Sequence, residues 1–325
     1  MSMFEQIFIA NSVYAEFLYL LRFPEKVNKT LFLIGPSCVG IEVPNRIPII
    51  GPKDMKNLPV LQENLAQQAY LLLQGRKVPC YGNVETIYSP FFVRNFPFYP
   101  VTDGLWDIQK FPAYLKENRF TKCYAVRYPG GLDLQDDRME YMDIPALWKG
   151  LSKTERKTLV GRFGIGPDEF DGLKKKKILL VTQPLSEDSI VSEEEKIRLY
   201  RSIVSRYFLS DIVIKPHPRE RTNWAEIFPT VPVVPRIVPA ELLALMTPQI
   251  ERIATFFSTS SCTVLPPERV DFYAKDFAKL HMMDEGRHDG DKPLRPAASF
   301  DVEESLKDNN FNWLRVPDDS FYKDK

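Results

Sequence analysis

The sequence predicts an α/β protein built from two tandem units. The chain has 325 residues, which suits two domains of about 150 residues each. Short apolar runs alternate with segments of helical spacing in both halves, and one polar, charge-dense stretch interrupts the alternation midway. A β–α–β order of this kind is typical of a largely parallel sheet covered by helices.

The first half opens with a strand, a helix and a second strand. Residues 3–10 (MFEQIFIA) and 29–35 (KTLFLIG) are short apolar runs, which predict core strands. Residues 12–23 between them have helical spacing. Residues 84–92 (VETIYSPFF) and 96–104 (FPFYPVTDG) predict β segments interrupted by proline.

Residues 57–77 predict the long helix of the first half. Its apolar residues recur at helical spacing, and a Gly-Arg-Lys sequence marks its exit. The side predicted to face the core carries Leu61, Leu65, Ala69 and Leu72.

Residues 148–177 are polar and contain several glycines, so we expect them to connect two domains. This gives an N-terminal α/β domain over residues 1–160 and a C-terminal one over 175–325. The second domain repeats the alternation of the first. Strands are predicted in 177–185, 211–218 and 252–266, and helices in 193–209 and 238–250.

Composition excludes several classes of protein. Lysine plus arginine and aspartate plus glutamate both number 43, so no basic field indicates a nucleic-acid partner. The four cysteines lack CxxC spacing, which argues against a disulfide framework or zinc site and favours a reducing cytosol. No apolar run reaches about 18 residues, and the N-terminus has no signal-peptide pattern. We expect a cytoplasmic protein.

The chain has three histidines, and the first, His217, follows the predicted strand DIVIK. Pro216 and Pro218 restrict the backbone on both sides and would aim the imidazole. In an open α/β sheet, ligands bind at the carboxyl ends of strands. The structural alternative is a strand-end histidine capped by a backbone carbonyl.

Two further segments offer groups that suit a nucleotide. Ser258, Thr259, Ser260 and Ser261 follow an apolar run, where hydroxyl and N–H groups suit a phosphate oxygen. Glu241 falls in the first turn of a predicted helix and could accept hydrogen bonds from two ribose hydroxyls. The alternatives are an ordinary serine-rich N-cap and plain helix capping.

Asp103 precedes a glycine at the end of an apolar segment in the first half. A carboxylate facing a cleft could act as a general base, whereas the structural alternative is a common Asp-Gly turn. The string HDGD at 288–291 resembles a metal-binding sequence, but its polar surroundings predict a solvated loop. We expect neither a metal ion nor a cofactor.

The order of these segments resembles the bacterial sialyltransferases of the two-domain GT-B type, which include lipooligosaccharide sialyltransferases and capsule polysialyltransferases. The resemblance is strongest over residues 178–267, through LLVTQPLSED, IKPHPRE, VPAELLALM and FSTSSCTV. In the first half it rests on TDG and the α/β pattern. It implies two Rossmann-like domains facing each other across a cleft, with the second domain holding CMP-sialic acid.

The resemblance also implies roles for individual residues. Asp103 would be the base of an acidic-acidic-glycine motif, although Thr102 stands at its first acidic position. His217 would protonate or hydrogen-bond the departing phosphate, and Glu241 would bind the ribose. Further contacts to the nucleotide would come from Lys215, Pro218, Ser260 and Ser261.

The acceptor would be a glycan, and a lipid-linked acceptor would bring the enzyme to the inner membrane face as a peripheral protein. Two alternatives remain open at this point. One is another CMP- or CDP-linked transferase, such as a Kdo or glycerol-phosphate transferase. The other is a nucleotide-binding protein without catalysis, an interpretation supported by Thr102.

Overall fold

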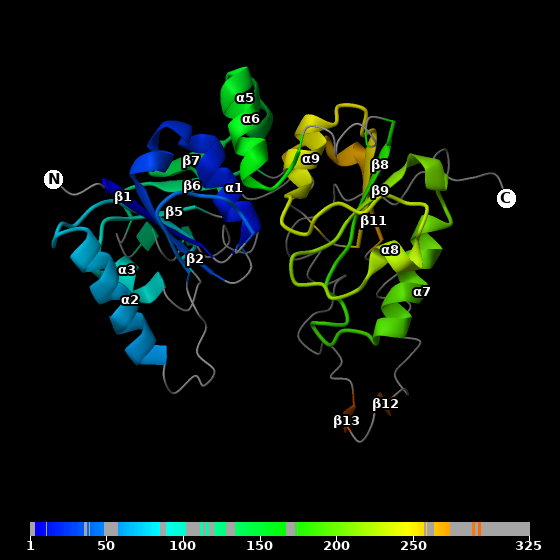
Figure 1. The fold of residues 1–325 in the computed structure, drawn as a ribbon, viewed down its shortest axis with the longest axis horizontal. Helices are drawn as coiled ribbons and strands as arrows, with labels where there is room; N and C mark the ends of the chain where they lie inside the picture. The colour runs from blue at the N-terminus through cyan, green and yellow to red at the C-terminus, as the bar shows by residue number, and fades with distance from the viewer. Residues whose placement is uncertain are drawn as a thin grey trace. The chain divides into compact units, whose positions relative to one another are not determined.

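The computed structural model describes residues 4–10, 12–35, 38, 40–48, 58–84, 89–101, 111–112, 115–116, 120–127, 134–166, 173, 175–256, 258, 263–273, 288–289 and 292–293. The chain divides into two compact units (Figure 1). The first unit comprises Met1–Arg127 and Leu132–Ile165, and the second comprises Tyr128–Gly131 and Gly166–Lys325. The assignment of domains to residues 1–160 and 175–325, with their roles, stays a prediction.

A parallel sheet forms the centre of the first unit. Its strands are β1 (Gln6–Ala10), β2 (Thr30–Ile34), β3 (Arg46–Pro48), β4 (Cys80–Gly82) and β5 (Phe98–Pro100), arranged in the order β3-β2-β1-β4-β5. The register pairs Phe8 with Phe32 and with Tyr81. The chain therefore reverses its direction of travel across the sheet beside β1, which places β1 and β4 at a topological switch point.

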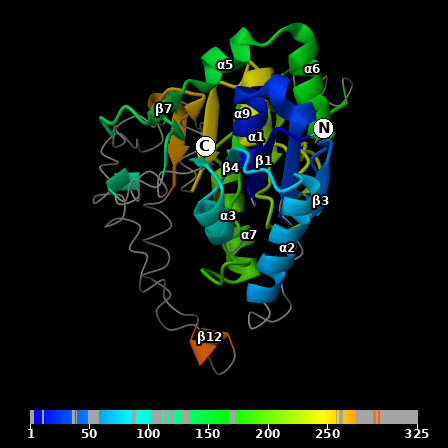
Figure 2. The same ribbon diagram turned by 90° about the vertical axis from the view of Figure 1, so that its left-hand side faces the viewer.

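Helices cover both faces of this sheet. The helix α1 (Val13–Arg22) follows β1, and α2 (Leu58–Leu72) precedes β4 on the other side, as right-handed crossovers require (Figure 1). The 3-10 helix η1 (Pro24–Lys29) leads into β2. Two short helices, α5 (Ile144–Gly150) and α6 (Lys153–Arg162), overlap in Figure 1 and are seen as separate helices in Figure 2.

A small parallel pair of strands extends the first unit. The strands β6 (Cys123–Val126) and β7 (Met139–Met142) pair with each other, and Val101 bridges to Tyr124. Aromatic packing fills the core around α1, where the Phe8 and Tyr19 rings stack at 4.3 Å. Gly82 ends β4 with φ 143°, and a Cβ there would lie 1.8 Å from the Ile9 carbonyl oxygen. Only glycine permits this close approach of β4 to β1.

A second parallel sheet forms the centre of the second unit. Its strands are β8 (Ile178–Val181), β9 (Ile212–Lys215), β10 (Arg252–Thr255) and β11 (Val270–Phe272), in the order β11-β10-β8-β9. The helix α7 (Glu193–Val204) connects β8 to β9, while α8 (Trp224–Ile227) and α9 (Ala240–Met246) connect β9 to β10. In Figure 1, α7 and α9 flank the strands on opposite sides. Short 3-10 helices, η5 (Leu209–Asp211) and η7 (Pro267–Arg269), precede β9 and β11.

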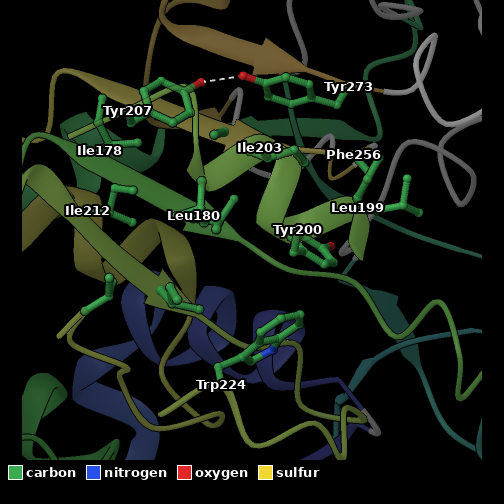
Figure 3. Close-up of a cluster of buried hydrophobic side chains, with 14 of the residues drawn as sticks. Ile178, Leu180, Leu199, Tyr200, Ile203, Tyr207, Ile212, Trp224, Phe256 and Tyr273 are labelled. Carbon is green, nitrogen blue, oxygen red and sulfur yellow. Dashed lines mark hydrogen bonds between the residues drawn. The ribbon is translucent and has the colours of Figure 1, made fainter. Parts of the chain in front are cut away.

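The core of the second unit lies between α7 and its sheet (Figure 3). Tyr200 meets Trp224 and Phe256 edge to face, at centroid distances of 4.9 and 5.1 Å. The hydroxyls of Tyr207 and Tyr273 form a hydrogen bond of 2.7 Å, drawn as a dashed line. Buried aromatic packing of this kind gives α7 a fixed position against the strands.

The α/β fold with parallel sheets predicted from the sequence is confirmed in both units. The arrangement of the units across a cleft stays a prediction. The prediction for residues 84–92 is wrong where the structure describes them, because α3 (Ser89–Asn95) is a helix. Pro90 suits the first turn of a helix, and Phe92 and Phe96, four residues apart, bury one face.

One further prediction is wrong. Leu72 is 44% exposed, and it is Leu73 that continues the buried row of Leu65 and Ala69. The connection predicted over residues 148–177 contains the boundary between the two units, at Ile165 and Gly166, and its first part forms the regular helix α6 of the first unit. A capping box between Ser152 and Glu155 starts this helix, whose described side chains are mostly polar.

The sequence HDGD was predicted to be a loop. Its first two residues form β12 (His288–Asp289), which pairs antiparallel with β13 (Lys292–Pro293). Within the described part of the chain, none of the helices combines the length and apolar character that crossing a bilayer requires.

Candidate active site at the carboxyl edge of the second sheet

Three predicted site residues lie in the second unit at or near the carboxyl edge of its sheet. Lys215 is the last residue of β9, His217 follows it, and Glu241 lies in the first turn of α9. Pro218 belongs to the same loop as His217. Three other predicted site residues, Asp103, Ser260 and Ser261, lie outside the described residues, as does Thr102.

Backbone hydrogen bonds hold His217 in a tight loop. Its N–H donates to Oε2 of Glu220 at 2.6 Å, and its carbonyl accepts the N–H of Glu220 at 3.0 Å. The imidazole Nδ1 accepts the N–H of Arg219 at 3.2 Å. The structural alternative of a carbonyl cap is therefore wrong for Nδ1, which is an acceptor. The proton of the neutral ring is on Nε2.

The imidazole of His217 is neutral at pH 7. Burial lowers its pKa to about 4, and the positive charges of Lys215 and Arg219 act in the same direction. The carboxylates of Asp188 and Glu187 oppose this shift without reversing it. His217 thus offers an N–H donor without a resting positive charge.

Lys215 adds a buried cation beside the histidine. Its ammonium donates to the carbonyl of Arg236 at 3.0 Å and to the carbonyl of Pro216. Burial lowers the pKa of Lys215 to about 8, while the carboxylates of Glu220 and Glu241 act to raise it. Lys215, His217 and the buried Glu241 therefore belong to one electrostatic cluster.

Two acidic residues that the sequence analysis did not assign complete this edge. Glu187 and Asp188 follow β8, and Asp188 binds the guanidinium of Arg219 through both carboxylate oxygens, at 2.5 and 2.8 Å. The next residue, Ser189, has φ 58°, a left-handed conformation that favours glycine. Glu187-Asp188-Ser189 thus meets both acidic positions of an acidic-acidic-glycine motif, with a serine in the left-handed conformation at the glycine position.

A signal for these residues was present in the sequence. An acidic pair stands a few residues after the apolar run that forms β8, as Pro-His-Pro follows the run that forms β9. Strands β8 and β9 are neighbours and parallel, so their carboxyl ends meet at one edge. Recognising the pair required the strand order, which the sequence alone does not provide.

The remaining polar groups are less completely defined. Ser258 donates its backbone N–H to Oγ1 of Thr255, at 3.2 Å, where β10 ends. Within the described ranges, no three or more His, Cys, Asp or Glu side chains gather in a way that could hold a metal ion. Among the described residues, the polar groups at this edge are hydrogen-bond donors, buried cations and carboxylates.

Comparison with known proteins identifies the family of the chain. The model of the family described as glycosyltransferase family 52 matches residues 52–276, which is more than half of the chain. The chain belongs to glycosyltransferase family 52. The resemblance to bacterial sialyltransferases of the GT-B type is thereby confirmed at the level of the family. This family 52 protein is a glycosyltransferase, and a nucleotide-sugar donor and a glycan acceptor follow in general terms.

One curated relative and two solved structures give the range of similarity. An uncharacterized protein of Haemophilus influenzae is 32% identical over 240 residues, covering 68% of this chain and 76% of the relative. The GT-B domain of a sialyltransferase from Photobacterium damselae has a TM-score of 0.48 at 10% identity, covering 82% of this chain and 89% of that one. A UDP-GlcNAc 2-epimerase from Neisseria meningitidis has a TM-score of 0.48 at 12% identity, covering 97% and 95%.

Proposed function

We propose that this family 52 enzyme transfers sialic acid from CMP-sialic acid to a hydroxyl of a glycan acceptor, with the nucleotide bound by the second unit. The observation that carries the proposal is the neutral Nε2–H donor of His217 beside the buried Lys215 ammonium. In open α/β sheets, ligands bind at the carboxyl ends of the strands, where these two groups lie. A hydrogen-bond donor next to a cation suits a phosphate oxygen.

The departing CMP defines the task of His217. The acceptor oxygen bonds to the anomeric carbon, the bond from that carbon to the phosphate oxygen breaks, and the phosphate gains negative charge. The Nε2–H of His217 donates a hydrogen bond to that oxygen as charge develops, and it can pass a proton to the oxygen only when the ring is the imidazolium. The phosphate also offsets the charges of Lys215 and Arg219, so the pKa of His217 rises when donor is bound. This stabilises the leaving group by preorganised charge.

Two carboxylates are candidates for the base that takes the acceptor proton. Asp103 is the assignment from the sequence and belongs to the first unit. Asp188 is supported by its motif and by its link through Arg219 to His217. We favour Asp188, with Asp103 as the alternative, and the variants described in the Discussion separate them.

The other proposed contacts hold the donor. Glu241 accepts hydrogen bonds from the ribose hydroxyls, and its negative charge acts to raise the pKa of Lys215. Ser260 and Ser261 bind the phosphate, and Pro218 lines the nucleotide site beside His217. The Glu241 contact is the same in the bound donor and in the transition state, so it contributes uniform binding, whereas the serine contacts strengthen as charge develops on the phosphate.

A donor screen tests the proposal. Purified protein is incubated with CMP-sialic acid, CMP-Kdo or CDP-glycerol and with galactose-terminated or sialic-acid-terminated acceptors, and products are read by mass spectrometry. We expect sialylated product from CMP-sialic acid, in EDTA as well as in buffer. Transfer only from CMP-Kdo or CDP-glycerol would contradict CMP-sialic acid as the donor and identify the other compound's class as the donor. Tight CMP binding without release from any donor would identify a nucleotide-binding protein without catalysis.

We also propose peripheral attachment to an anionic membrane surface through the end of α2. Tyr70, Leu71 and Leu72 are exposed there, Leu71 to 74%, and the exposed cations Arg76 and Lys77 follow. Apolar side chains next to basic ones suit an anionic lipid surface.

Cosedimentation with phosphatidylglycerol and phosphatidylcholine vesicles tests this attachment. Binding should require the anionic lipid and be lost in a variant with Leu71→Ser and Leu72→Ser. Phe208→Ser, which changes an exposed side chain of the second unit, should bind like the natural protein. Equal sedimentation with and without vesicles would contradict the attachment.

A further inference from the structure

Lys196 is a buried charge that the proposed reaction does not use. It lies on α7, its side chain is 0% exposed, and its helix packs against the sheet. Lysine is almost never fully buried unless it is paired. The partners of its ammonium therefore indicate why it is there.

Those partners come from both loops of the candidate active site. The ammonium lies 2.7 Å from Oε2 of Glu187, in the loop after β8, and 3.1 Å from Oε1 of Glu220, in the loop after β9. It also donates to Oγ of Ser186 at 3.4 Å. A single cation thus joins the two loops through Glu187 and Glu220, which are 33 residues apart in the sequence.

Each carboxylate in turn contacts the opposite loop, Glu220 through a side-chain hydroxyl and Glu187 through a backbone N–H. Oε2 of Glu220 accepts the N–H of His217 and the hydroxyl of Thr182, which follows β8. Oε1 of Glu187 accepts the N–H of Arg221, in the loop after β9, at 2.5 Å. The loops are therefore tied to each other through both carboxylates.

The charges of this cluster depend on the lysine. Burial would raise the pKa of Glu187, but the Lys196 ammonium and the Arg221 N–H bring it to about 2. Burial raises the pKa of Glu220, against the opposing effect of Lys196. Without the cation, two carboxylates would face each other with no compensating charge, which is a costly arrangement in a buried site.

We propose that Lys196 is a positioning residue that clamps the loop of Asp188 to the loop of His217 and so sets the geometry of transfer. This proposal rests on the proposed function for its effect on rate, while the clamp itself is a property of the free protein. Lys196 touches neither reacting atom in this scheme. It acts through Glu187 and Glu220.

Lys196→Met tests the clamp, because methionine keeps the length of the side chain and removes the charge. In the full-length folded variant we expect the pKa of His217, followed by NMR, to move toward its ordinary value as the loop opens to water. The kcat for transfer should fall about 10- to 100-fold, the cost of misplacing catalytic groups by about 1 Å. The donor KM should change less than the kcat.

Two further variants keep the test decisive. Arg198→Met removes the cation of an exposed i,i+3 pair on the same helix and should leave both the His217 titration and the kcat unchanged. Lys196→Met combined with Glu220→Gln removes the buried charge imbalance, so it should recover folding if the single variant is unstable. Its kcat should stay at least 10-fold below that of the natural protein.

The outcomes separate the clamp from the function. A folded Lys196→Met variant with the natural His217 titration and natural kcat overturns the clamp. A displaced His217 titration in a protein that transfers no sialic acid supports the clamp and overturns only the proposed donor. Equal losses in Arg198→Met and Lys196→Met would mean that α7 responds to any lost cation, which also overturns the proposal.

Discussion

The N–H of Arg219 donates to Nδ1 of His217 across 3.2 Å, which leaves the single proton of the neutral imidazole on Nε2. The same arginine binds both carboxylate oxygens of Asp188 with its guanidinium. One residue therefore fixes the tautomer of the proposed acid and the position of a proposed base. The predictions below follow from this relationship and from the buried charges around it.

The pKa of His217 should be about 4 in the free protein and should rise when CMP binds. Burial and the charges of Lys215 and Arg219 hold it down, and the phosphate of CMP offsets those charges. NMR of the ring nitrogens against pH measures both values, with His217→Gln assigning the signal. A pKa near 6.5 in the free protein, or no response to saturating CMP, would contradict the site.

Glu241→Gln should weaken CMP binding about 10-fold, the usual effect of losing one hydrogen bond to a charged group. The kcat should change little, since a ribose contact is equally present in the ground and transition states. Steady-state kinetics and CMP calorimetry measure the two effects. The control is Glu226→Gln, an exposed carboxylate on α8. A collapsed kcat with an unchanged donor KM would refute the ribose role.

The sequence predicted the strands that are short apolar runs bounded by turn residues, which are β1, β2, β8, β9 and β10, and the proline-interrupted β5. Strands β3, β4, β6, β7 and β11 were not predicted. Strands β8 and β9, and the helix between them, lie within the predicted segments. The helix α3 was missed since its Ser-Pro-Phe-Phe start is rich in aromatic residues, which favour strands. Packing of Phe92 and Phe96 overrides that preference.

The candidate site was only partly accessible to sequence analysis. His217 was found because prolines flank it at a strand end. Asp188 and Lys196 were not, because their meaning depends on the neighbouring positions of β8 and β9 and on which face of α7 is buried. Pairing across loops more than 20 residues apart has no local signature.

Glu16→Gln should flatten the dependence of stability on pH. Burial raises the pKa of Glu16, on α1, from 4.5 to about 8, so the folded state keeps its proton where the unfolded chain has lost it. The stability linked to this proton is complete below pH 4.5 and is lost as pH rises toward 8. At pH 7 the loss is roughly 2 to 4 kcal/mol in the natural protein, and the variant should lack it.

Urea unfolding at pH 5, 6, 7 and 8 measures this slope for Glu16→Gln. The comparison of slopes is independent of any constant cost of burying the new amide. Glu5→Gln removes an exposed carboxylate of the same unit, paired with Lys29, and should keep the natural slope. If Glu16→Gln and the natural protein have parallel curves, Glu16 is ionised in the folded state at neutral pH.

The last prediction identifies the base. Asp188→Asn should leave CMP affinity nearly intact and reduce transfer by roughly 10²- to 10⁴-fold, the usual range for general catalysis. Asp103→Asn should have a much smaller effect. The opposite ranking would assign the base to Asp103 and leave Asp188 as an anchor for Arg219.

Arg219→Gln is the matched control, because it breaks the same ion pair and keeps the Asp188 carboxylate. If Asp188 only anchors the arginine, the two variants should lose activity equally. If Asp188 is the base, Asp188→Asn should lose more activity than Arg219→Gln. A donor with an activated leaving group adds a second distinction. It should restore His217→Ala more than Asp188→Asn, because such a leaving group needs less protonation while the acceptor hydroxyl still has to lose its proton.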